Sequence, residues 1–133
     1  MANLTIVAAD VSPVVVIEQM TAPASETITA GDYVRLNTST GKAEPGNGST
    51  TAEVRRGGIA LTSAGTNETV TYMKRGTVDL GDALGTLAFD ADIYVSDTDG
   101  LLADSAGTVS RVVGTVEAAW GNTSADRVLR VDL

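Results

Sequence analysis

The chain has 133 residues, and its 17 acidic and 9 basic residues give a formal net charge of −8, without a single Cys or His. Disulfides, thiolate zinc sites and the Ser-His-Asp and Cys-His catalytic devices are therefore excluded within one chain. Because an acidic surface repels phosphate backbones, we expect a soluble protein with no nucleic-acid partner. Without His and Cys the chain lacks the usual general base and metal ligands, so we also expect no cofactor and no enzymatic activity.

The chain is expected to begin with an arm. Residues 1–13 are small and mixed, end at Pro13, and predict a flexible arm ahead of one β-rich domain over residues 14–133. The mostly apolar run over residues 14–20 is typical of a strand buried on both faces. This run is too short to span a membrane, and no basic residue precedes Arg35. We therefore expect neither a signal peptide nor a membrane partner.

Alternating apolar residues and Gly turns predict β-strands along the rest of the chain. The expected strands span residues 32–37, 58–62, 68–74, 77–80, 92–96, 108–118 and 127–133. One short helix is expected over residues 50–56, ended by Gly57 and Gly58. The predicted fold class is mainly β, a compact barrel-like or sandwich-like domain with that one helix and an extended N-terminal arm.

A weak internal repeat runs through these strands. Residues 32–34 and 93–95 each begin a unit of strand, Gly turn, returning strand, turn and strand. Two interpretations stay open. Such patterns recur by chance in all-β chains, and a barrel or sandwich can also be built from two similar halves.

Few side chains are candidates for chemistry. Asp97 and Asp99 beside Gly100 match part of a calcium loop, but Val95 occupies the first ligand position and no distal Glu follows. A solvated hairpin is the simpler interpretation. A carboxylate pair for glycoside hydrolysis is unspecific among 17 acids. Trp120 is either an anchor for a partner or a residue at the edge of the core. We therefore expect no metal site and no catalytic residue.

The N-terminal arm is the most informative candidate for binding. Asn3, Leu4, Thr5, Ile6 and Val7 form a β-compatible series with no obvious reason to fold back locally. An extended arm of this kind can add as a strand to an exposed sheet edge of a partner. The alternatives are a frayed terminus and an edge strand of its own domain.

From residue 14 to its end, the chain resembles the small capsid decoration proteins, or head-stabilisation proteins, of tailed bacteriophages. The likeness consists of a free N-terminal segment, Gly-Asp-Tyr-Val at 31–34, Arg-Arg-Gly-Gly-Ile-Ala at 55–60, and β elements at 70–76, 92–95 and 127–131. It depends on the order and spacing of strands and Gly turns, and it includes no catalytic signature.

This resemblance implies a homotrimer on the outer surface of the virion capsid, made in the host cytoplasm. The arm at residues 3–7 would contact the major capsid protein by strand addition and so stabilise the expanded head. Two alternatives from other classes remain. One is another virion structural or adhesin-type module, such as a head fibre base or tail component. The other is a carbohydrate- or calcium-binding module.

Overall fold

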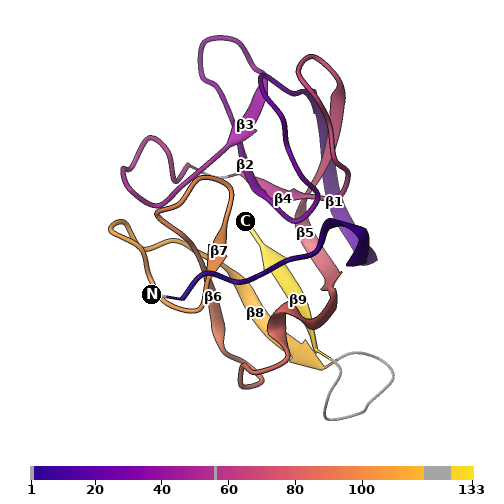
Figure 1. Cartoon of the computed structure of the whole chain (residues 1–133), viewed down its shortest axis with the longest axis vertical. Coiled ribbons are helices and arrows are strands. Elements are labelled where there is room, and N and C mark those ends of the chain that lie inside the picture. Colours follow the sequence, from indigo (N-terminus) through magenta and orange to yellow (C-terminus); the bar gives the residue numbers. More distant parts are fainter. Residues whose placement is uncertain (1, 56, 119–126) are drawn as a thin grey trace.

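Strand β5 (Thr69–Leu80) is the central element of one curled antiparallel sheet and belongs to both halves of the molecule (Figure 1). The computed structural model describes residues 2–55, 57–118 and 127–133. β5 pairs with β4 (Gly58–Ala60) through its first half and with β9 (Arg127–Asp132) through its second half. β1 (Val11–Pro23) pairs with β5 along its whole length.

The remaining strands complete two units with the same pairing. They are β2 (Tyr33–Leu36), β3 (Ala43–Pro45), β6 (Asp92–Val95), β7 (Leu102–Ala103) and β8 (Val112–Ala118). β2 lies between β3 and β4, and β4 is followed by β5. In the same way, β6 lies between β7 and β8, and β8 is followed by β9. Of the two interpretations of the sequence repeat, this pairing supports two similar halves.

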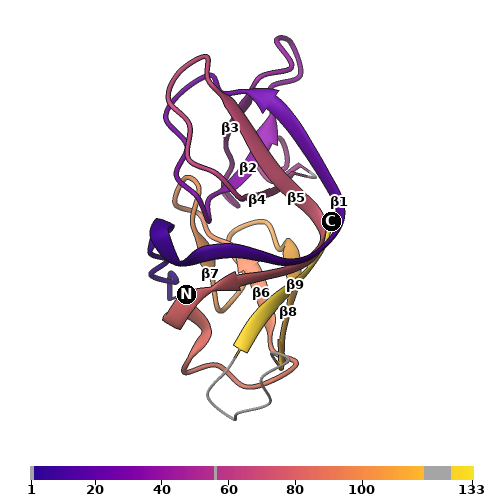
Figure 2. The same cartoon turned by 90° about the vertical axis from the view of Figure 1, so that its right-hand side faces the viewer.

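The prediction of a mainly β fold is confirmed, and the sheet has the shape of a half-barrel. Figure 2 shows the curl at the point where β1 and β5 bend together. The nine strands in the described ranges belong to a single sheet, so a two-layered sandwich is not confirmed.

Gly76 allows the two long strands to bend while they stay paired. Its φ is +139°, and a Cβ at this position would lie 2.2 Å from the carbonyl oxygen of Val15. Only glycine accommodates both conditions. The register of β1 against β5 shifts between Val16 and Glu18, next to the same bend, as expected where a bulge increases local twist.

Two apolar clusters lie against the sheet. The larger one is built from both halves and includes Tyr33 and Ile59 from the first half with Ile93 and Leu129 from the second. The smaller one lies within the first half and includes Tyr72 of β5. Because β5 supplies residues to both clusters, it couples the packing of the two halves.

The helix expected over residues 50–56 is not confirmed. Residues 51–54 form one turn, in which the amide of Val54 donates to the carbonyl oxygen of Thr50 at 3.1 Å. The chain must then pass Gly57, where a Cβ would lie 1.8 Å from the carbonyl oxygen of Val34, so β2 leaves no room for another helical turn. The helical segments of the described ranges are two short 3₁₀ turns, η1 (Ala8–Asp10) and η2 (Gly81–Leu84).

Candidate binding surfaces

The N-terminal segment, residues 2–7, packs against its own domain across the open side of the curl (Figure 1). The amide of Leu4 donates to the carbonyl oxygen of Leu102 in β7 at 2.8 Å, and the amide of Asp104 donates to the carbonyl oxygen of Ala2 at 3.1 Å. Leu4 is 9% exposed and belongs to the larger apolar cluster. A separate flexible arm is therefore not confirmed, because residues 2 and 4 are hydrogen-bonded to β7 and to Asp104, which follows it.

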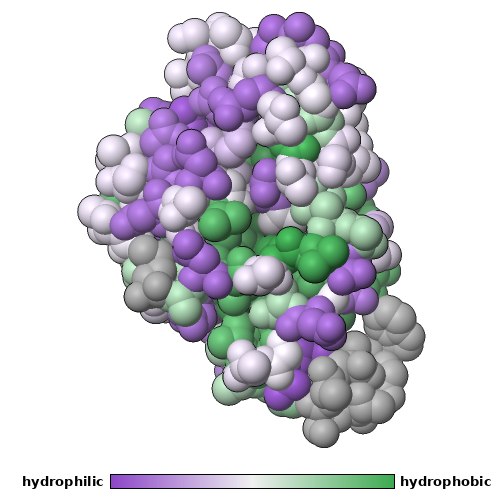
Figure 3. Space-filling model, viewed as in Figure 1, coloured by the Kyte–Doolittle hydropathy of each residue, from purple (hydrophilic) through white to green (hydrophobic). Residues whose placement is uncertain are grey.

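The predicted binding residues of this segment divide into two sets. Leu4 and Ile6 face inward, and Ile6 lies so close to Gly31 that a Cβ there would be 2.6 Å from the Ile6 side chain. Asn3, Thr5 and Val7 are exposed, and Val7 is 55% exposed. Figure 3 shows apolar surface crossing the middle of the face on which this segment lies. Within the outward set, Thr5 and Val7 meet solvent, whereas the side chain of Asn3 accepts a hydrogen bond from the hydroxyl of Ser96 at 2.5 Å.

Strand β1 carries a second exposed apolar surface, here called the β1 strip. It consists of Val15, Val16, Ile17 and Met20, which are 52%, 45%, 62% and 47% exposed. Every residue from 15 to 21 is exposed, so both faces of the strand meet solvent. The strand itself was predicted correctly, but the prediction of burial on both faces is wrong for the single chain.

The exposure of β1 follows from its place in the sheet. β1 pairs with β5 on one edge, and among the described strands it has no neighbour on the other edge. The apolar clusters lie against the inner strands, and of the residues in β1 only Ala22 is buried. Prolines stand near both ends, at Pro13 and Pro23, and register shifts interrupt the strand, which are common features of protected edges.

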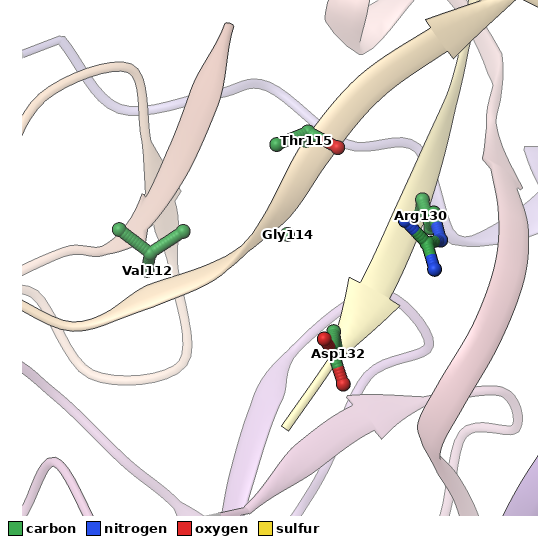
Figure 4. A pocket seen from close by; sticks show the side chains of 5 residues that line it. All are labelled: Val112, Gly114, Thr115, Arg130 and Asp132. Atoms are coloured by element: carbon green, nitrogen blue, oxygen red, sulfur yellow. The ribbon is translucent and has the colours of Figure 1, made fainter. Parts of the chain in front are cut away.

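A shallow hollow of about 250 Å³ lies on the outer side of β8 and β9 (Figure 4). Its lining residues are Val112, Gly114, Thr115, Arg130 and Asp132. The hollow is smaller than the roughly 300–1,000 Å³ of typical small-molecule sites.

The calcium candidates Asp97 and Asp99 accept hydrogen bonds from neighbouring loops. Asp97 accepts hydrogen bonds from the backbone amide and the hydroxyl of Thr108, at 2.9 and 2.7 Å. Asp99 accepts one from the side-chain amide of Asn47. The bonds from Thr108 lower the pKa of Asp97 below its ordinary value. Within residues 2–55, 57–118 and 127–133, no three acidic residues gather in a way that could hold a metal ion.

Sequence patterns gave no signal for the main polar cluster of the first half. The guanidinium of Arg35 in β2 forms ion pairs with Glu44 and, at 3.1 Å, with Glu53. Nearby, the hydroxyl of Tyr33 donates to the carbonyl oxygen of Arg55 and accepts from the amide of Gly57. These ion pairs and hydrogen bonds fasten the 50–55 turn to β2. Trp120, for which a partner anchor and a residue at the edge of the core were both open, lies outside the described residues.

Neither a scan against models of protein families nor a search of the curated proteins finds a match for this sequence. None of the helices in the described ranges is long and apolar enough to cross a membrane. The candidate surfaces therefore have to be interpreted from their own chemistry.

Proposed function

We propose that this protein is a bacteriophage capsid decoration protein, a homotrimer that binds the outside of the expanded head through the major capsid protein and stabilises the shell. The observation that carries this proposal is the presence of two separate, nearly uncharged surfaces on a strongly acidic body. Residues 2–9 carry no charged side chain, and β1 carries one, Glu18. A decoration protein needs two such surfaces, one for the shell and one for its own copies.

The shell contact is assigned to residues 3–7, with Thr5 and Val7 as the side chains that meet the partner, while the side chain of Asn3 is held by Ser96 of its own domain. The backbone groups of residues 2 and 4 point to β7 and its flanking loop, as their hydrogen bonds indicate. In an extended segment, alternate residues direct their backbone groups to opposite edges. Residues 3 and 5 thus offer a free edge, and a strand of the capsid protein can be added there without detaching the segment.

Trimer formation explains how so small a contact can hold a shell together. Each segment offers only a few residues, and its affinity for a partner strand is expected to be modest. Three segments on one rigid trimer bind with a raised effective concentration, which strengthens the whole by a factor of roughly 10²–10⁴. Stabilising a shell in this way requires no turnover chemistry, in keeping with a chain that contains no His and no Cys.

Co-sedimentation with expanded shells of the parent phage that lack this protein tests the proposal. The wild-type chain is expected to pellet with the shells, and Val7→Glu is expected to remain in the supernatant. Val112→Glu is the matched control, because Val112 is also exposed, at 39%, but lies on β8. Deleting residues 1–12 is a poorer test, since it would also remove Leu4 from the core. A wild-type protein that does not pellet, or a Val7→Glu variant that pellets normally, would contradict the shell contact.

A further inference from the structure

We propose that the β1 strip is the surface through which three copies of this chain associate around a three-fold axis. This inference rests on the homotrimer of the proposed function and names the surface that forms it. Its starting point is a mismatch within β1. The run from residue 14 to 20 has the apolar pattern of a strand covered on both faces, and the single chain leaves both faces open. An assembly that covers them resolves the mismatch.

Charge favours this strip over most other surfaces for a contact between copies. Each copy carries a net charge of −8, so two copies repel each other over most of their surface. β1 contains one charged residue in its 13 positions, Glu18. Glu18 stands opposite Arg75 in the ladder with β5, and Arg75 lies 3.6 Å from Asp132. The one acid of the strand is thus placed next to a base, and two copies can approach here with little repulsion.

The size of the strip suits the centre of a protein interface. Residues 12–21 are exposed or half-buried, and at about 3.3 Å per residue they extend over about 33 Å. Because neighbouring strands lie about 4.8 Å apart, each face of β1 covers about 160 Å². In a contact with one neighbour, this is about a fifth of the roughly 800 Å² that each partner contributes to a standard interface, so β1 supplies only the centre of the contact. An apolar centre with a polar rim is also the usual composition of such contacts.

Exposure on both faces indicates a three-fold axis in preference to a two-fold axis. A single partner that packs flat against one face of a strand leaves the other face open. In a closed ring of three, each copy has two neighbours, and a strand near the axis meets one neighbour on each face. Val15 and Val16 are adjacent in β1, point to opposite faces and are both about half exposed. A two-neighbour environment is the one that covers both.

The free edge of β1 favours a contact between copies through side chains over one through backbone hydrogen bonds. Another strand is hindered from pairing along the free edge of β1. The obstacles are Pro13 and Pro23 near the ends and the register shifts between Pro13 and Glu18. Open-ended edge pairing would produce filaments, whereas side-chain packing that relates neighbours by a rotation of 120° closes into a ring of three copies. In Figure 2, residues 2–7 lie on the left and the middle of β1 forms the right-hand edge, so the shell contact stays outside this interface.

The mass of the full-length chain in solution tests this inference. Size-exclusion chromatography with light scattering, at about 1–100 μM chain, is expected to give a trimer. The double variant Val16→Lys/Ile17→Lys places two charges in the middle of the strip and is expected to give a monomer with unchanged far-ultraviolet circular dichroism. The control pair Leu36→Lys/Val112→Lys changes two residues with 40% and 39% exposure on β2 and β8, and it is expected to remain trimeric. A wild-type monomer, dimer or filament, or a lysine variant that remains trimeric, overturns the inference.

Cross-linking provides a second measurement that does not require a charged variant to fold. The chain has no Cys, so Ile17→Cys introduces a single thiol, and a short bis-maleimide is expected to join copies through it. Val112→Cys is the control and is expected to stay uncross-linked, and equal cross-linking of the two variants overturns the inference. Shell binding separates the two proposals. If the wild-type chain is a trimer that the lysine variant dissociates, but it never pellets with shells, the decoration role alone is disproved. If the chain pellets with shells but forms no trimer that depends on β1, this inference alone is disproved.

Discussion

Gly76 of β5 lies directly opposite Val16 of β1 and so close to Val15 that a Cβ on Gly76 would be 2.2 Å from the carbonyl oxygen of Val15. This contact holds the two longest strands together where both of them bend. The bend brings the middle of β1 to the outside of the molecule, where Ile17 is 62% exposed. One glycine thus connects the curl of the sheet to the exposure of the β1 strip.

Replacing Gly76 with Ala should strain this contact and lower the free energy of unfolding by about 3 kcal/mol, because the new Cβ meets the Val15 carbonyl and the φ of +139° disfavours a side chain. Gly41→Ala is the matched control. Its φ is +70°, but nothing lies within 4 Å of its Cβ position, so the expected loss is about 1 kcal/mol. Urea unfolding measures both values. If the two variants lose the same free energy of unfolding, the close approach of Gly76 to β1 does not contribute to stability.

Truncating Leu4 should destabilise the whole domain, because its side chain is 9% exposed and packs in the larger apolar cluster. We expect Leu4→Ala to lower the free energy of unfolding by about 2–3 kcal/mol. Val7→Ala, at a position that is 55% exposed, should change it by less than about 0.5 kcal/mol. Thermal or urea unfolding is the measurement. A flexible arm that never joins the core would instead leave both variants as stable as the wild type.

Removing the charge of Arg35 should leave the carboxylates of Glu44 and Glu53 without their partner in a poorly exposed site. The side chains of Arg35 and Glu44 are 12% and 17% exposed. We expect Arg35→Met to cost about 2 kcal/mol, between the values for buried and for exposed ion pairs. Arg75→Met is the control, since Arg75 is 54% exposed, and its loss should be below about 1 kcal/mol. A similar loss from the two variants in urea unfolding would argue against a structural role for the cluster.

Asp97 should contribute to acid sensitivity. Its hydrogen bonds from Thr108 lower its pKa in the folded protein below the ordinary value of 3.8. A lowered folded-state pKa means that the stabilisation is complete above the ordinary value and disappears as the pH falls through the folded-state pKa. Asp97→Asn should therefore be less stable than the wild type at pH 7, and the difference should shrink below about pH 4.

Melting temperatures from pH 7 to pH 2.5 measure this effect of Asp97. Asp82→Asn, at an exposed carboxylate in η2, is the control for the loss of one negative charge. A constant difference between Asp97→Asn and the wild type over the whole range would contradict the link to the Thr108 hydrogen bonds.

Local patterns in the sequence were enough to locate most strands. The strands expected at 92–96 and 127–133 correspond to β6 and β9 within one residue at each end, because alternation and Gly turns act over a few neighbouring positions. Residues 68–74 and 77–80 were predicted as two strands and form one, β5, since Gly76 bends the chain without interrupting its pairing. The expected helix over 50–56 had favourable cap residues, but the close approach to β2 limited it to one turn.

The candidate surfaces were only partly predictable. The β-compatible character of residues 3–7 was visible, but their packing on β7 depends on Leu102, about a hundred positions away in the chain. The salt-bridged cluster of Arg35, Glu44 and Glu53 gave no pattern, because its members come from three separate segments. The sequence likewise could not reveal that the apolar run in β1 would remain uncovered.

The sequence by itself determined the β-rich class and the absence of His- and Cys-based chemistry, because residue type and short-range periodicity are local properties, and it left open whether the weak repeat marks two similar units. The tertiary structure decided which faces are covered. Leu4 is buried because the edge of β7 accepts its backbone, and the β1 strip is exposed because β1 has a neighbour on one side only. Whether an apolar strand is packed against another segment depends on contacts between residues far apart in the chain. This packing decides whether the strand belongs to the core or forms a surface available to a partner.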